Sequence, residues 1–229
     1  MESTSTLHTQ KLRQPLTPEL IAQLLQPYTD IATEQPEYSA STQPDWPKIH
    51  AQLATYLDLI LKWNARTNLT AIRTPEEIIQ RHFGESLFAG AHLGACATLL
   101  DFGSGAGFPG LPIQLLRPDI SVTLAESQGK KAAFLREVIR SLGLPTEVWA
   151  KRVETMPATR QFDVVTLRAV DNMEAAVQGA ILRAKERVLI MGTSRPSSYP
   201  LLADSFHVAE PIPMPQANET ALLIAQRIR

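Results

Sequence analysis

The sequence contains a single cysteine, Cys96, among 229 residues. One cysteine excludes an intramolecular disulfide and any zinc or iron–sulfur site built from several cysteines, so we expect no bound metal. Long uncharged apolar runs are also missing, because charged residues, glycine or proline interrupt the apolar stretches. Residues 1–15 lack the basic start and apolar core of a secretory signal. These absences argue against a membrane or secreted protein and favour a cytoplasmic one.

The sequence also has no excess of charge of either sign. It carries 22 Lys and Arg against 23 Asp and Glu, a formal net charge of -1. This balance argues against a chain that binds nucleic acid over its whole surface, but it leaves room for a local basic face. Hydrophobic residues make up 44% and charged residues 20% of the chain, which is typical of a globular protein that can bury one sizeable core.

The N-terminal part is rich in Ser, Thr, Gln and Pro, and parts of it have helical periodicity. Residues 1–45 are predicted to be a partly flexible leader with one short helix, which begins after the N-cap Thr17 and ends at Pro27. Residues 46–95 are predicted to form an N-terminal helical region. Its first helix has apolar residues at three- and four-residue spacing, and its second helix covers 75–89.

From residue 96 onward, predicted strands alternate with predicted helices, a pattern that indicates a doubly wound parallel sheet. The last two predicted strands, 204–210 and 219–229, are separated by only eight residues. This gap is too short for a crossover helix, so these strands should pair antiparallel. A mostly parallel, seven-stranded α/β sheet that ends in an antiparallel hairpin is the Rossmann-like architecture of class I methyltransferases. The preceding strands are predicted at 97–102, 121–126, 146–150, 162–170 and 187–192, with helices at 128–143 and 174–184.

A glycine-rich loop, GSGAGFPG, follows the first predicted strand. Gly103, Gly105 and Gly107 let the backbone turn sharply and approach a ligand, and the next helix offers free N–H groups. Gly105, Gly107 and Gly110 also match the dinucleotide pattern G-x-G-x-x-G, which is a weak signal for NAD. Asp101, at the end of the strand, favours S-adenosylmethionine instead, because a carboxylate suits its cationic groups better than it suits a pyrophosphate.

Glu126 ends the second predicted strand, about 20 residues beyond the glycine loop. In folds of this class an acid at this place accepts hydrogen bonds from both ribose hydroxyls of the bound nucleoside. We therefore expect Glu126 to orient the cofactor.

Six segments, in their order and spacing, closely resemble the RsmG (GidB) family of bacterial methyltransferases, which modify guanine N7 in 16S ribosomal RNA. The resemblance covers about residues 46–229. It implies S-adenosylmethionine as cofactor, and 16S ribosomal RNA or the small ribosomal subunit as the partner of a monomeric enzyme. The segments are KWNARTNLTAI (62–72), RHFGESL (81–87), LLDFGSGAGFPGLPI (99–113), TLAESQGKKAAFLREV (123–138), KRVETMP (151–157) and VVTLRAV (164–170).

The resemblance also implies roles for individual residues. Arg168, at the carboxyl end of the fourth strand, would lie beside the methyl-transfer site as the catalytic residue and matter more for turnover than for folding. His82, judged by its residue type alone, is expected to be structural. Asn64, Asn68 and Thr70 are expected either to fix the N-terminal helices against the cofactor domain or to contact the substrate. Implied cofactor contacts are Gly103, Phe108, Val153, Glu154 and Arg168; expected phosphate contacts on a local basic face are Arg66, Arg73, Arg81, Lys130 and Lys131.

Three positions depart from the family pattern. Met191-Gly192 stands where members often have Lys-Gly, Glu219 stands near an expected Arg, and Glu85 replaces an aspartate.

Three other functions stay open. The alternatives are a methyltransferase of a small molecule or protein, a non-catalytic cofactor-binding relative, and an NAD oxidoreductase. A Pro-Pro-aromatic motif is missing after the fourth strand, and Cys96 precedes the first strand. Both observations argue against methylation of an exocyclic amine or a pyrimidine carbon.

Overall fold

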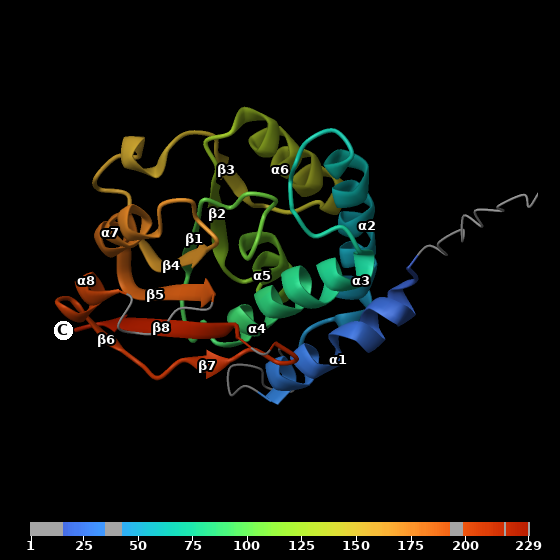
Figure 1. The fold of residues 1–229 in the computed structure, drawn as a ribbon, viewed down its shortest axis with the longest axis horizontal. Helices are drawn as coiled ribbons and strands as arrows, with labels where there is room; N and C mark the ends of the chain where they lie inside the picture. Colours follow the sequence, from blue (N-terminus) through green and yellow to red (C-terminus); the bar gives the residue numbers. More distant parts are fainter. Residues whose placement is uncertain (1–15, 35–42, 193–198, 218, 229) are drawn as a thin grey trace, which may run out of the picture.

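The computed structural model describes residues 16–34, 43–192, 199–217 and 219–228, and a mixed β-sheet lies at its centre (Figure 1). The strands run in the order β3-β2-β1-β4-β5-β8-β6, and β7 pairs with β8. Neighbours are parallel from β3 to β5, whereas β8 is antiparallel to β5, β6 and β7. The strands are β1 (Thr98–Phe102), β2 (Ser121–Ala125), β3 (Glu147–Trp149), β4 (Phe162–Arg168), β5 (Ala184–Gly192), β6 (Phe206–Val208), β7 (Ile212–Pro213) and β8 (Ala221–Arg227).

This sheet confirms the predicted fold class, including the reversed final strand. All seven predicted strands are present, and the two-residue strand β7 adds an eighth. It lies in the linker between the last two predicted strands, where Ile212 pairs with Leu222 and Pro213 with Ala221. Two residues in a proline-rich segment are too few to show the alternating pattern that predicts a strand. Strand β7 therefore forms only because β8 lies beside it to pair with.

Helices cover both faces of the sheet, and each face has its own core (Figure 1). Successive residues of a strand point to opposite faces, so Leu99 and Val164 join one core while Leu100 and Val165 join the other. The first face carries α1 (Pro18–Glu34), α2 (Trp46–Asn64), α4 (Glu85–Ala91), α5 (Gly110–Leu116) and α6 (Gly129–Leu142); the second carries α7 (Met173–Arg183) and α8 (Pro200–Ala203). The N-terminal helices therefore share a core with the sheet.

Helix α1 does not end at Pro27, as the sequence predicts, but continues through it to Glu34. An internal proline costs a helix roughly 3 kcal/mol. Beyond it, however, Tyr28 and Ala32 are 2% and 0% exposed, and the Tyr28 hydroxyl donates to the carbonyl of Pro215 at 2.9 Å. Burial of a large side chain contributes about 1.5–3 kcal/mol, so tertiary packing offsets the proline. The remainder of the predicted flexible leader lies outside the described residues.

The helix predicted over 75–89 is present, but its middle is a π-helix. Its parts are α3 (Pro75–Glu77), η1 (Ile78–Gly84) and α4. A Cβ added to Gly84 would lie 2.5 Å from the Tyr28 ring, so this glycine allows α1 to pack closely here. Wider π-helical turns often occur at functional sites, and η1 places His82 beside the sheet.

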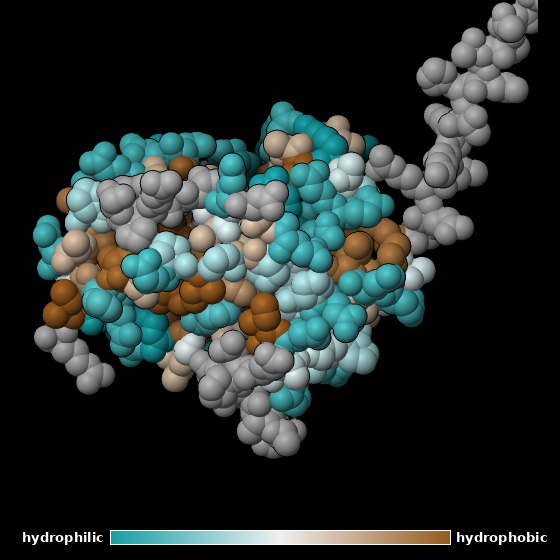
Figure 2. All heavy atoms as spheres, turned by 60° about the horizontal axis from the view of Figure 1, so that its bottom comes forward, coloured by the Kyte–Doolittle hydropathy of each residue, from teal (hydrophilic) through white to brown (hydrophobic). Residues whose placement is uncertain are grey.

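The surface gives no sign of a membrane-spanning segment among the described residues. None of their helices is both long and apolar enough to cross a bilayer. On the face drawn in Figure 2, hydrophobic residues form small groups between hydrophilic ones, as on most protein surfaces.

Candidate active site

A cavity of about 910 Å³ opens at the carboxyl ends of the parallel strands, where open α/β sheets bind ligands. The loops after β1, β2 and β4 line it, together with the short 3-10 helix η2 (Val153–Thr155). Residues of η1 and the segment 69–72 also line it. Predicted cofactor residues that line this one cavity are Gly103, Gly105, Phe108, Glu126, Val153, Glu154 and Arg168.

The glycine loop presents its backbone to the cavity. Gly103 and Gly105 have φ values of +73° and +58°, a left-handed conformation that favours glycine. A Cβ added to Gly105 would have only the Gly103 carbonyl oxygen near it, at 3.9 Å. It would otherwise point into open space, so a ligand can approach the main chain closely here.

The sequence predicts Asp101 and Gly107 as cofactor contacts, but neither residue lines the cavity. The Asp101 carboxylate is 1% exposed and accepts hydrogen bonds from the Gly110 N–H and the Thr166 hydroxyl, both at 3.0 Å. A Cβ added to Gly107 would lie 2.5 Å from the Tyr56 hydroxyl, so glycine is needed there for packing. Both residues hold the loop in shape, and neither faces the cavity.

Burial gives Asp101 a pH-dependent effect on stability. Burial raises its pKa from 3.8 to about 6, although hydrogen bonds from Gly110, Ser104 and Thr166 act in the opposite direction. A carboxyl group with a raised pKa in the folded state destabilises the fold where it is ionised. The destabilisation caused by ionised Asp101 is therefore small below pH ~4, grows between pH ~4 and ~6, and reaches its full size above that range.

We expect Asp101→Asn to gain stability relative to the parent as the pH rises. The amide can keep hydrogen bonds to Gly110 and Thr166 without carrying a buried charge. The difference in free energy of unfolding between variant and parent should increase by about 2 kcal/mol from pH 4 to pH 7. Urea unfolding at several pH values measures this difference, and a constant difference would show that Asp101 does not titrate in the folded protein as described.

Glu126 joins the end of β2 to the glycine loop. Its Oε2 accepts from the Gly105 N–H at 2.9 Å, and its Oε1 accepts from the Gln128 N–H at 2.7 Å. The residue is only 6% exposed, yet it lines the cavity. Each carboxylate oxygen has further acceptor capacity, so the fixed carboxylate can bind two hydroxyl groups, as its predicted role requires.

Arg168 connects the sheet to the helix that carries His82. At the end of β4, its Nη2 donates to Glu85 Oε2 at 2.8 Å and to the Arg81 carbonyl at 2.7 Å. The side chains of Arg168 and Glu85 are 13% and 4% exposed. Burial raises the pKa of Glu85, while the charges of Arg168 and Arg81 lower it. This buried ion pair makes Arg168 a structural residue as well as a cavity residue.

His82 is neutral, and the position of its proton follows from its neighbours. Burial, followed by the charges of Arg168 and Arg81, lowers its pKa to about 2. Arg168 Nη1 lies 2.9 Å from Nδ1, and because arginine can only donate, Nδ1 must accept. The ring proton is therefore on Nε2, which lies 2.7 Å from the Thr70 hydroxyl oxygen. His82 also stacks on Phe108, with ring centroids 4.6 Å apart, so its predicted structural role agrees with its contacts.

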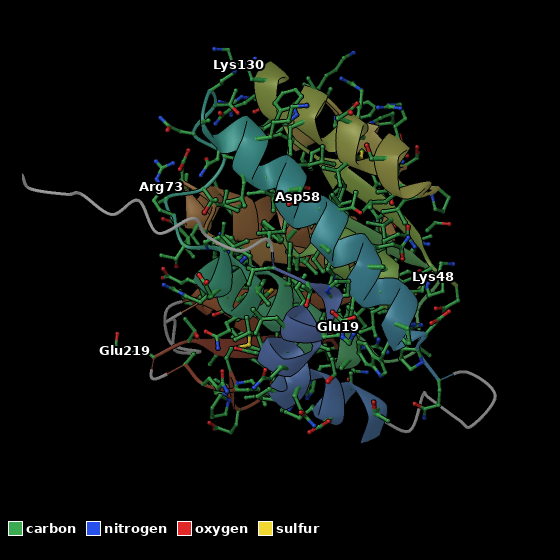
Figure 3. All side chains as sticks on the ribbon, turned by 90° about the vertical axis from the view of Figure 1, so that its right-hand side faces the viewer. Glu19, Lys48, Asp58, Arg73, Lys130 and Glu219 are labelled. Atoms are coloured by element: carbon green, nitrogen blue, oxygen red, sulfur yellow. The ribbon has the colours of Figure 1, made fainter. Side chains whose placement is uncertain are left out.

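The predicted RNA-binding residues are divided between the cavity and the surface beside it. Arg81 and Lys131 line the cavity, as do Lys151 and Arg152. The remaining three, Arg66, Arg73 and Lys130, are exposed. In Figure 3, Arg73 and Lys130 extend from the side of the molecule opposite to Lys48.

Thr70, for which the sequence leaves substrate contact open beside a structural role, lines the cavity. Thr220, which sequence patterns did not single out, lines it as well. Thr70 is held in place by Asn64, whose Oδ1 accepts from the N–H groups of Leu69 and Thr70 at 2.9 and 3.2 Å. These contacts favour a structural role for Asn64. Met191, one of the departures from the family pattern, lies near the end of β5, is buried and also lines the cavity.

A family model described as GidB, rRNA small subunit methyltransferase G, matches residues 49–198. The chain belongs to this family. It is 44% identical over 140 residues to the ribosomal RNA small subunit methyltransferase G of Nitrosomonas europaea, an alignment that covers 61% of this chain and 63% of that protein. The corresponding protein of Chromobacterium violaceum is 37% identical, with 76% of this chain and 73% of that protein covered.

A solved structure supports the fold. The N-methyltransferase NodS of Bradyrhizobium japonicum, in complex with S-adenosyl-L-homocysteine, matches with a TM-score of 0.52 at 13% identity. The match covers 76% of this chain and 99% of NodS. The family is described as one of methyltransferases, and the glycine loop and Glu126 suit S-adenosylmethionine as the methyl donor.

Proposed function

We propose that this chain transfers a methyl group from S-adenosylmethionine to N7 of a guanosine in 16S ribosomal RNA. One observation carries the proposal: the nucleoside-binding features and four basic side chains line the same cavity. Glu126 and the glycine loop lie on one side of it, and the basic residues are Arg81, Lys131, Lys151 and Arg152. Membership of the GidB family and the names of its relatives support ribosomal RNA as the substrate.

Residues of the chain would hold the cofactor from several sides. The Gly103 and Gly105 backbone would contact it closely, and Glu126 would accept from its ribose hydroxyls. Val153, which is 5% exposed at the cavity wall, offers an apolar surface for the adenine, with Glu154 beside it. The cofactor, when bound, supplies an electrophilic methyl group on a sulfonium.

Methylation at N7 suits a site with little acid–base chemistry. Guanine N7 has an available lone pair and carries no proton, so no base is required to create the nucleophile. In this cavity His82 is neutral and both of its ring nitrogens have partners, while Arg168 stays protonated. The protein then needs only to hold N7 close to the methyl group. Positioning alone can lower the activation barrier by roughly 7–11 kcal/mol.

Basic residues around the cavity would contact the RNA backbone. We infer that Arg66, Arg73 and Lys130 extend the basic surface outward from Arg81 and Lys131. We also propose that the enzyme acts as a cytoplasmic monomer without a metal. Within the described ranges, no group of three or more His, Cys, Asp or Glu side chains is placed to hold a metal ion.

Charge reversal at Arg73 and Lys130 is expected to weaken RNA binding. Each phosphate contact releases counterions, so the double variant Arg73→Glu/Lys130→Glu should bind small ribosomal subunits at least about tenfold more weakly, with a shallower dependence on salt. Lys48→Glu is the matched control, because Lys48 is exposed on the opposite side (Figure 3). Affinity should be measured from low to high salt. If the affinity for small ribosomal subunits changes neither with salt nor with these charge reversals, the substrate is a small molecule or a protein instead.

The proposed activity is tested by incubating the protein with small ribosomal subunits and labelled S-adenosylmethionine. Nuclease digestion and mass spectrometry of the nucleosides should then identify 7-methylguanosine as the product. Methylation of another base, or of a ribosomal protein, would contradict the N7 proposal, and no methyl transfer at all would favour a non-catalytic relative.

A further inference from the structure

We propose that the Thr70 hydroxyl recognises O6 of the target guanine and so separates guanine from adenine. This inference rests on the proposed function, because it concerns the base that enters the same cavity. Thr70 lies in the segment 69–72 and lines the cavity beside His82, whose ring stacks on Phe108 of the glycine loop. Its hydroxyl has two acceptor positions and one proton.

Both acceptor positions of the Thr70 hydroxyl are occupied. One accepts from His82 Nε2, which must carry the ring proton because Arg168 donates to Nδ1. The other accepts from the N–H of Ile72 at 3.1 Å. A hydroxyl has two acceptor lone pairs and one proton, so only its proton remains. Among the described residues, Thr70 donates to no partner through its side chain.

The neighbouring groups prevent this arrangement from reversing. Arg168 is held by Glu85 and the Arg81 carbonyl, and the His82 ring is fixed against Phe108. The Thr70 backbone is fixed by Asn64. A change of tautomer would put the Nδ1 proton against the Arg168 donor, and a half-turn of the ring would turn both ring nitrogens away from Arg168 and Thr70. Thr70 is therefore set as a hydrogen-bond donor on the cavity wall.

A fixed donor next to the methyl-transfer site discriminates between purines. The edge that carries N7 has a second acceptor, O6, in guanine, but it has a donor, the N6 amino group, in adenine. A hydroxyl that can only donate forms a hydrogen bond with O6, whereas the adenine amino group would bring a second donor against it. It also leaves N7 free, as the reaction requires.

The test combines a protein change with a base change. The probes are guanosine 5′-monophosphate and the ribonucleotide of 2-aminopurine, which lacks O6, and both are titrated into protein saturated with S-adenosylhomocysteine. The parent should prefer the guanine nucleotide by about fivefold, the size of one neutral hydrogen bond. Thr70→Val, which has nearly the same shape, should lose this preference, and Thr70→Ser should keep it. Equal affinities in the parent, or an unchanged preference in Thr70→Val, would overturn the proposal.

A kinetic measurement separates specificity from structure. With small ribosomal subunits, Thr70→Val should lower kcat/KM by at least about fivefold, while affinity for S-adenosylmethionine stays as in the parent and Thr70→Ser restores the rate. An unchanged kcat/KM would also overturn the role of Thr70. If Thr70→Val fails to fold, the parent protein and Thr70→Ser still test the proposal. Both should prefer the guanine nucleotide over that of 2-aminopurine, and equal affinities would overturn the proposal. Failure of the parent to methylate subunits would contradict the proposed function alone.

Discussion

Replacing Arg168 with alanine is expected to lower the free energy of unfolding by roughly 3–5 kcal/mol, the usual cost of breaking a buried ion pair. The change would leave the Glu85 carboxylate, whose side chain is 4% exposed, without its closest cation. It would also remove the donor to His82 Nδ1 and the donor to the Arg81 carbonyl. These bonds join β4 to the helix over 75–91, so the loss affects the contact between sheet and N-terminal helices. This differs from the expectation, drawn from sequence, of a role mainly in turnover.

The exposed pair of Arg140 and Glu137 provides a matched control. Its N–O distance is also 2.8 Å, but its side chains are 73% and 34% exposed. Because solvent screens exposed ion pairs and they contribute little to stability, Arg140→Ala should unfold almost like the parent. The double variant Arg168→Met/Glu85→Leu should recover much of the lost stability, since it leaves no buried charge. Urea unfolding measures all three variants.

The effect of Arg168→Ala should also depend on pH. The pKa of Glu85 is already raised by burial and lowered by Arg168, so removing Arg168 raises it further. A raised pKa means that the destabilisation grows as the pH rises and Glu85 ionises. The loss of stability should thus be smaller near pH 5 than near pH 8. If Arg168→Ala keeps the stability of the parent and loses only activity, Arg168 serves the reaction without holding the helix.

Replacing Glu126 with alanine is expected to raise the dissociation constant for S-adenosylmethionine at least about tenfold, the scale of a lost pair of charge-assisted hydrogen bonds. The carboxylate would no longer accept from the ribose, and the N–H groups of Gly105 and Gln128 would lose their acceptor. Both effects act on the cofactor, because Gly105 lies where the backbone meets the cavity.

Isothermal titration calorimetry with S-adenosylmethionine measures this change. Glu174→Ala is the control, because Glu174 is an exposed acid outside the lining of the cavity. Glu126→Gln should give an intermediate loss, since an amide keeps one acceptor oxygen. A Glu126→Ala protein that binds the cofactor as tightly as the parent would exclude the ribose role.

Local patterns in the sequence were enough to predict the elements of the sheet and much of the cavity. The alternation of strands and helices and the short gap before the last strand both depend on neighbours in sequence, and the structure agrees with both. The glycine loop and Glu126 were predictable for the same reason. Each follows directly after a strand, and the carboxyl ends of parallel strands meet at one edge.

Tertiary structure alone decided the features that depend on contacts between distant segments. Pro27 stays within α1 because Tyr28 and Ala32 are buried beyond it. Asp101 turns away from the cavity because the Gly110 N–H and the Thr166 hydroxyl lie beneath it. The donor role of Thr70 depends on a chain of bonds from β4 through His82. Which atom of a polar residue faces a ligand is set by the partners that occupy its other positions, and those partners come together only when the chain has folded.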